Sequence, residues 1–216
     1  MKMKNNPNKT LHSDHSRPYH HGDLHQQLLD AAGDLLEENN IASLSLRAVA
    51  KKVGVSHSAP YRHFKDKESL LAGIAAVGFK ELASKMLGVV SIYPDDPAAQ
   101  LQEAGYQYMT LAIKKPQCMQ LMFGNILPCH DTYPELQSAG EFAFNGLKMI
   151  IEAGQSKGIF KPGDVELLAL AAWSTIHGLS ILFISGEVEE TISLSVNVKE
   201  LAFSISEIML NGIKSN

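Results

Sequence analysis

The 216-residue chain lacks the features of several large protein classes. It has only two cysteines, Cys118 and Cys129, which form no metal-type cluster, so we expect reduced thiols in a core or pocket. No uninterrupted apolar run approaches the ~18–20 residues of a membrane span. The basic start MKMKNNPNKT is followed by LHSDHSRPYHH, where a signal peptide needs an apolar region. These absences predict a cytoplasmic protein without a membrane partner.

Catalytic motifs are also missing. The chain has no nucleophile, base and acid at a readable spacing, no glycine-rich phosphate loop, and no His-x-x-x-His pair beside a glutamate. Cys118 or Cys129 could pair with His177 as thiol and base, but no local pattern supports that pairing. We therefore expect no catalytic residue, no cofactor and no enzyme activity.

Charge is scarce and unevenly distributed. Charged residues make up 19% of the chain, with a formal net charge of −4. Residues 1–67 carry ten Lys and Arg against seven Asp and Glu, whereas residues 68–216 carry nine against sixteen. Seven of the nine histidines lie in the first 63 residues. A basic head on an acidic body suits a head that meets a polyanion, although a solvated surface explains so small an excess equally well.

Helical periodicity runs along most of the chain, with no strand-like alternation long enough to compete. It predicts an all-α fold of about nine helices, with a flexible polar arm at 1–19, a head at 20–67 and a body at 68–216. The last helix is expected over about 196–210. Caps and prolines mark the expected helix starts: Asp23, Ser45, Asp66, Pro97, Pro116, Pro134 and Asp164.

The segment Leu46–Phe64 has the spacing of a helix-turn-helix, two short helices joined by a tight turn. Gly54 stands where the turn needs a left-handed residue, and Ala50, one helical turn earlier, lets the two helices approach closely. The apolar positions that would form the shared buried wedge are Val49, Val53, Val55, Pro60 and Phe64.

The second helix of this segment contains a proline, Pro60, so we expect it to begin between Ser56 and Ser58 with an irregular first turn. Its outer face carries groups that donate hydrogen bonds to phosphates or base edges: His57, Ser58, Tyr61, Arg62 and His63. Lys67 is a candidate phosphate clamp at the next helix start, and Arg47 could reach a phosphate or a groove edge. The alternative is an aromatic-rich helix that only packs on its neighbours.

The stretch LSLRAVAKKVGVSHSAPYRHFKDKESLL resembles the DNA-binding segment of the TetR family of bacterial transcriptional regulators. The resemblance covers about residues 19–75 and includes YHHGDL, which is similar to one subgroup, with His25 where a basic residue is common. It implies a homodimer that reads a palindromic operator. The roles implied are a helix cap for Ser45, phosphate contacts for Tyr61, His63 and Lys67, and groove contacts for His57, Ser58 and Ala59. WSTIHG, at 173–178, resembles a C-terminal domain with a Trp-His-Gly signature.

The body is expected to hold a small-molecule pocket, which needs an apolar cavity with a few polar groups. Trp173 and His177 are four apart on one apolar helix, so both can face the same space. The candidate ligand-binding residues are Tyr106, Met109, Cys118, Met122, Phe123, Phe142, Trp173 and His177. Plain core packing explains any single one of them equally well. The apolar helix after Asp164 and the last helix are expected to bury a dimer seam.

The leading hypothesis is a ligand-responsive DNA-binding repressor that binds its operator as a dimer and is released by a small apolar or aromatic effector. Activation in place of repression fits the sequence as well. Metal sensing is an alternative, because the N-terminal region carries His12, His15, His20, His21 and His25, although polar arms also collect histidines that bind nothing. An enzyme is the remaining alternative.

Overall fold

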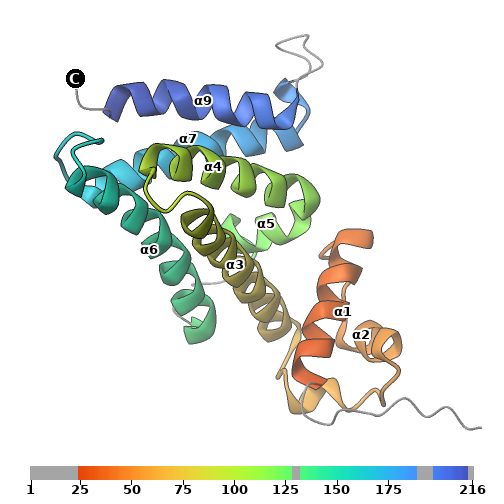
Figure 1. Cartoon of the computed structure of the whole chain (residues 1–216). Coiled ribbons are helices and arrows are strands. Elements are labelled where there is room, and N and C mark those ends of the chain that lie inside the picture. Colours follow the sequence, from red (N-terminus) through yellow and green to blue (C-terminus); the bar gives the residue numbers. More distant parts are fainter. Residues whose placement is uncertain (1–23, 128–131, 189–196, 214–216) are drawn as a thin grey trace, which may run out of the picture.

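The computed structural model describes residues 24–127, 132–188 and 197–213, and these residues are mostly helical (Figure 1). They form eight α-helices and one short 3₁₀-helix, which confirms the all-α prediction. The elements are α1 (Leu24–Glu38), α2 (Leu46–Val53), η1 (Pro60–Arg62), α3 (Lys67–Ile92), α4 (Pro97–Lys114), α5 (Pro116–Phe123), α6 (Pro134–Ser156), α7 (Val165–Ile184) and α9 (Val198–Ile213). The predicted arm and the cap Asp23 lie outside the described residues.

Most helices begin at the predicted caps, because a cap satisfies backbone N–H groups that the first turn leaves free. Ser45 Oγ accepts from the backbone N–H of Ala48 at 3.2 Å. Asp66 and Ser69 bond each other's backbone in a reciprocal capping box at the start of α3. Asp164 likewise caps α7. Pro97, Pro116 and Pro134 occupy the first turns of α4, α5 and α6.

The last helix, α9, extends beyond the predicted end near residue 210. Leu210 and Ile213 are both buried, so the apolar stripe continues to the observed end of the helix. The carbonyl of Ile213 also accepts a hydrogen bond from the backbone N–H of Lys161 at 2.7 Å. This contact with the segment between α6 and α7 stabilises the additional turn.

The head has the predicted helix-turn-helix packing. Val49, Ala50 and Pro60 are buried, and Phe64 is only 4% exposed. Gly54 has φ +80°, and its N–H donates to the carbonyls of Ala50 and Lys51, which closes α2 in the left-handed conformation that glycine adopts most readily. The predicted left-handed conformation of Gly54 is therefore confirmed, and Ala50 is fully buried.

The second helix of the motif is shorter than predicted. Residues 56–59 form a turn, in which the N–H of Ala59 donates to the carbonyl of Ser56 at 3.0 Å, and η1 then begins at Pro60. Pro60 occupies the first position of η1, where its missing N–H removes no helical hydrogen bond. Its carbonyl accepts from both His63 and Phe64 at 2.9 Å. With Ala59 as the cap and Pro60 as the first residue, the start lies beyond the predicted interval of Ser56 to Ser58, so that prediction was wrong.

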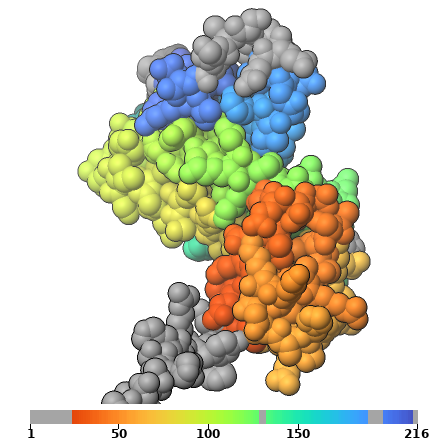
Figure 2. Space-filling model, turned by 90° about the vertical axis from the view of Figure 1, so that its right-hand side faces the viewer, coloured from red at the N-terminus to blue at the C-terminus, as the bar shows by residue number. Residues whose placement is uncertain are grey.

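The helix α3 joins the head to the body as one uninterrupted element (Figure 1). Its first turns pack on α1, and further along it packs on α4, α5 and α6. The helix α4 in turn packs on α7 and α9. The head therefore projects from one end of a helical body, and the space-filling view shows the same separation (Figure 2).

The helix α7 is apolar nearly all round but only partly covered. It packs on α4, α6 and α9, and Ala169, Ala172, Ile176 and Ser180 are its buried residues. Its length and composition alone would also allow it to cross a membrane, and only 22% of its apolar stretch is buried inside the structure. The sequence expectation of no such run overlooked it, because Ser, Thr and His interrupt the apolar residues.

Candidate nucleic-acid interface and internal cavity

Most of the predicted DNA-contacting side chains are exposed, and they belong to the start of α2, the turn after α2 and η1, which together are called the exposed surface of the head. Tyr61 is 52% exposed although its ring is large and apolar. Ala59 is half-buried, and the hydroxyl of Ser45 serves as a cap acceptor while keeping its own proton to donate. The remaining exposed members are Arg47, His57, Ser58, Arg62 and His63.

Lys67 does not project freely from this surface. Its ammonium donates to the carbonyls of Ile41 at 2.6 Å and Ala42 at 3.1 Å, which ties the loop between α1 and α2 to the start of α3. The three donors of a lysine leave one for another acceptor. Lys67 therefore holds the head together in this structure, and a phosphate contact would be an additional role.

His25 directly follows the YHHGDL segment, at the position where a basic residue is common. Its ring stacks on Phe64 with centroids 5.0 Å apart and lies 5.8 Å from the ring of His63. The imidazole therefore covers an edge of the helix-turn-helix core. The other four histidines of the metal-sensing hypothesis lie outside the described residues.

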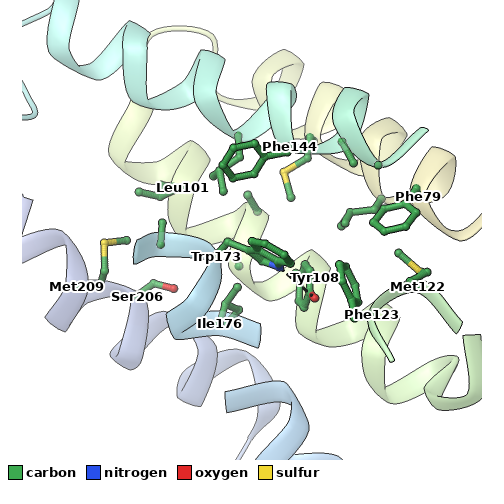
Figure 3. A pocket seen from close by; sticks show the side chains of 18 residues that line it. Phe79, Leu101, Tyr108, Met122, Phe123, Phe144, Trp173, Ile176, Ser206 and Met209 are labelled. Atoms are coloured by element: carbon green, nitrogen blue, oxygen red, sulfur yellow. Dashed lines mark hydrogen bonds between the residues drawn. The ribbon is translucent and has the colours of Figure 1, made fainter. Parts of the chain in front are cut away.

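The body encloses a cavity of about 250 Å³ between α3, α4, α5, α6, α7 and α9 (Figure 3). Among the described residues its wall has no charged side chain, and it is mostly apolar, with five aromatic rings and three thioethers. The lining residues are Phe79, Leu82, Met86, Leu101, Ala104, Gly105, Tyr108, Met122, Phe123, Gly140, Ala143, Phe144, Leu147, Ala172, Trp173, Ile176, Ser206 and Met209. Such a wall suits an uncharged and largely apolar ligand.

Three of the eight predicted ligand-binding residues line this cavity: Met122, Phe123 and Trp173. His177 lies just behind the wall, where its ring is 5.0 Å from Phe123 and 5.9 Å from Trp173. The predicted proximity of Trp173 and His177 is therefore confirmed.

The other four predicted residues lie elsewhere. Phe142 is 57% exposed. Gly140 and Phe144 lie on the cavity side of α6, and Phe142 is two positions from each of them, so it points about 200° away around the helix axis. Met109 is fully buried in the core. The ring of Tyr106 packs on Phe203 of α9, with centroids 6.4 Å apart.

Cys118 faces a different recess, bordered by α1, α3, α4 and α5. Its thiol contacts the carbonyl of Ile74 and the sulfur of Met122, both at 3.9 Å. Burial raises the pKa of this thiol to about 12, so it stays protonated at neutral pH. Its contacts do not include His177, so the pair of Cys118 and His177 considered from the sequence is not formed, whereas Cys129 lies outside the described residues.

Tyr108 is the polar centre of the cavity and was missed by sequence reasoning. Trp173 Nε1 donates to the Tyr108 hydroxyl at 3.4 Å, and that hydroxyl lies 2.7 Å from His177 Nδ1. Because an indole N–H can only donate, the Tyr108 oxygen accepts from Trp173, and the Tyr108 hydroxyl shares a second hydrogen bond with His177 Nδ1, whose direction follows the histidine tautomer. Burial lowers the pKa of His177 and raises that of Tyr108, so both side chains are neutral near pH 7.

The head contacts the cavity region through α5. The carboxylate of Glu37, near the end of α1, accepts from the backbone N–H of Gln117 at 3.1 Å and of Cys118 at 2.8 Å. These are the second and third residues of α5, so Glu37 caps that helix from the head. Lys115, just before α5, bonds Glu81 of α3 at 2.7 Å. Nothing in the sequence spacing pointed to Glu37, because its partners lie about 80 residues away.

A helix-turn-helix head on a helical body that encloses an apolar cavity defines a class of DNA-binding regulators, and comparison with known proteins gives the same class. The model of the tetR family of bacterial regulatory proteins matches residues 28–74, and that of a tetracyclin repressor-like C-terminal domain matches residues 101–199. The chain belongs to the TetR family of transcriptional regulators. The Trp-His-Gly subtype of the body is not confirmed.

Individual relatives agree with this assignment. The regulator AcrR of Shigella flexneri is 35% identical over 78 residues, a match that spans 36% of either chain. The uncharacterized regulator YobS of Bacillus subtilis is 24% identical over 195 residues, 88% of this chain and 93% of YobS. A protein of unknown function from Rhodococcus sp. RHA1 has a solved structure that superposes with a TM-score of 0.80 at 30% identity, covering 92% of this chain and all of that one.

Proposed function

We propose that the chain is a dimeric, ligand-responsive repressor that releases a palindromic operator when a small apolar or aromatic effector enters the body cavity. One observation carries the proposal: α5 lines the cavity at one end and is capped by the head at the other. Met122 and Phe123 belong to the cavity wall, and Glu37 of α1 holds the first turn of the same eight-residue helix. A ligand that displaces the aromatic end therefore acts directly on the head.

The close packing of α5 on α3 supports a concerted response. A side chain added at Gly78 of α3 would place its Cβ 2.6 Å from Met122 Sδ and 2.7 Å from Cys118 Sγ. The two helices are thus in close contact, and α5 has little room to shift without moving α3. Because α3 also begins in the head, a ligand that prefers the shifted arrangement would change the position of both heads. Release requires that the effector bind this arrangement more tightly.

The uncovered face of α7 supports a homodimer. Leu167, Leu170, Ile181 and Leu182 are 45–65% exposed and recur at helical spacing, and Gly178 between them has open space around it. Ile208 of α9 is 70% exposed. Contiguous apolar surface of this kind marks an interaction site, and a two-fold axis would let the same surface cover itself. We propose that α7 and α9 of two copies form this seam.

Operator binding is proposed to use the exposed surface of the head. Arg47, Tyr61 and Arg62 are exposed, and their side chains suit phosphates and base edges. The half-buried Ala59 and the small Ser58 would let η1 enter the major groove deeply.

The test begins with a duplex that the protein itself selects from random sequence, because the operator is then found without prior assumptions. Fluorescence anisotropy on this duplex should show an affinity that falls steeply with salt. The slope of the logarithm of the binding constant against the logarithm of the salt concentration should decrease in magnitude by about 1 when Arg47→Ala removes one phosphate contact. Tyr61→Phe should also weaken binding. Lys114→Ala, an exposed lysine of the body, is the matched control and should change neither quantity. Selection of no duplex, or identical salt slopes for all three variants, would overturn the assignment.

A further inference from the structure

The hydroxyl of Ser206 on α9 is the open polar group of the cavity. The residue is only 6% exposed and lines the cavity, yet its Oγ bonds no partner among the described residues. Among the described residues no buried side-chain oxygen or nitrogen lacks a partner, so this oxygen is not sealed in the core but stays accessible from the cavity. Ser180 of α7 shows the usual solution, because its hydroxyl is fully buried and donates to the Ile176 carbonyl at 2.8 Å.

The residue opposite Ser206 keeps this hydroxyl accessible. Gly105 of α4 faces it across the cavity wall, and a Cβ at position 105 would lie 2.9 Å from Ser206 Oγ and 3.5 Å from Ile176 Cδ1. Any larger residue would therefore press on the hydroxyl. Gly105 and Ser206 together form a small polar notch in an otherwise apolar wall.

The second polar position, Tyr108, offers much less to a ligand. Its hydroxyl is already hydrogen-bonded to His177, and its oxygen also accepts from Trp173. In the close-up, Ser206 lies apart from Tyr108, with Trp173 and Ile176 between them (Figure 3). Among the described lining residues, Ser206 is therefore the one hydroxyl that bonds no other side chain, and none of them carries a charge that could balance an ion.

We propose that Ser206 is the polar anchor of the effector site and that the effector is an uncharged, largely apolar molecule with one neutral oxygen, a hydroxyl or carbonyl, that accepts a hydrogen bond from Ser206. This inference rests on the proposed function, since it assigns the chemistry of the same cavity. A volume of about 250 Å³ lies just below the usual range for drug-sized ligands, so the effector is small.

Trp173 provides a local probe of binding, because it is the only tryptophan in the chain and lines the cavity. Three ligands of nearly equal size separate the interactions: 4-phenyl-1-butanol carries the hydroxyl, pentylbenzene replaces it with a methyl group, and 4-phenylbutyrate replaces it with an anion. Excitation at the red edge of the indole band avoids absorption by these phenyl compounds. Titrations without DNA then report ligand affinity alone.

The expected result is a selective loss in Ser206→Ala. The alcohol should bind this variant roughly two- to tenfold more weakly than it binds the wild type, as expected for one neutral hydrogen bond, while pentylbenzene binds at least as well. Retained pentylbenzene binding also shows that the variant is folded. Ser180→Ala, which removes a buried hydroxyl outside the cavity wall, should change neither affinity. The butyrate should bind the wild type most weakly of the three.

Three results would each overturn the role of Ser206 as the anchor. The first is an equal loss of affinity for the alcohol and for pentylbenzene in Ser206→Ala. The others are butyrate binding as tight as that of the alcohol, and no response of Trp173 to any of the three ligands. A separate titration in the presence of the selected operator distinguishes this failure from that of the proposed function. If the alcohol requires Ser206 but never changes operator affinity, the anchor stands and the repressor mechanism fails. If another ligand releases the operator without any dependence on Ser206, the repressor mechanism stands and the anchor fails.

Discussion

The contact between Glu37 and α5 gives a prediction of defined size. Two backbone N–H groups at the first turn of α5 donate to one carboxylate, at 2.8 and 3.1 Å. A helix cap contributes about 0.5–2 kcal/mol, and hydrogen bonds to a charged group lie at the upper end of the usual range. Glu37 is half-buried, so solvent weakens the interaction only in part. We therefore expect Glu37→Ala to destabilise the attachment of α5 by about 1–2 kcal/mol.

Amide hydrogen exchange of Gln117 and Cys118 measures this attachment directly. A loss of 1–2 kcal/mol predicts exchange that is faster by about 5- to 30-fold at these two amides, with a smaller effect in Glu37→Gln, which keeps one carbonyl oxygen. Glu38→Gln is the control, because the neighbouring Glu38 bonds Lys52 at 2.9 Å and not α5. Unchanged exchange at both amides in Glu37→Ala would refute the view that the head holds α5. Operator affinity that still responds fully to ligand in this variant would refute its role in coupling.

Three further predictions concern other parts of the molecule. Leu170→Lys on the exposed face of α7 should shift the protein to monomers in sedimentation velocity, whereas Phe142→Lys, equally exposed but on α6, should not; monomers in neither variant would contradict the seam. Gly54→Ala, at φ +80°, should lower the free energy of unfolding by about 1–2 kcal/mol in urea titrations, and no change would contradict the left-handed turn. Burial lowers the pKa of His177, so the unfolded state binds more protons below about pH 6.5 and stability falls there; His177→Asn should lose less stability than the wild type between pH 7.5 and 5.5, and equal losses would contradict the assignment.

The fold was predictable from the sequence because its signals are local. Ser45, Asp66 and Asp164 begin helices through hydrogen bonds to residues only two or three positions away. Gly54 was predictable for the same reason, since a left-handed turn depends on one residue. The start of the next helix was placed too early, because Pro60 restricts where a helix can begin but does not select between a helical and a 3₁₀ conformation.

The cavity was less predictable, because periodicity shows which side of a helix is apolar but not where packing leaves a space. Met109 and Met122 have the same chemistry, yet the first is fully buried in the core and the second lines the cavity. Phe142 and Phe144 differ only in the direction in which α6 presents them, which is set by the position of α3 and α7.

The residues that sequence reasoning missed all gain their roles from partners that are distant in the sequence. Tyr108 gains its importance from His177 and Trp173, which lie more than 60 residues away in the chain, and Glu37 and Ser206 gain theirs from α5 and from Gly105. A polar residue on an otherwise apolar face is the one signal that could have identified Ser206, since burial without a partner is unfavourable. That signal shows that the hydroxyl needs an acceptor, and only the packing around it shows that the space beside it is open to a ligand.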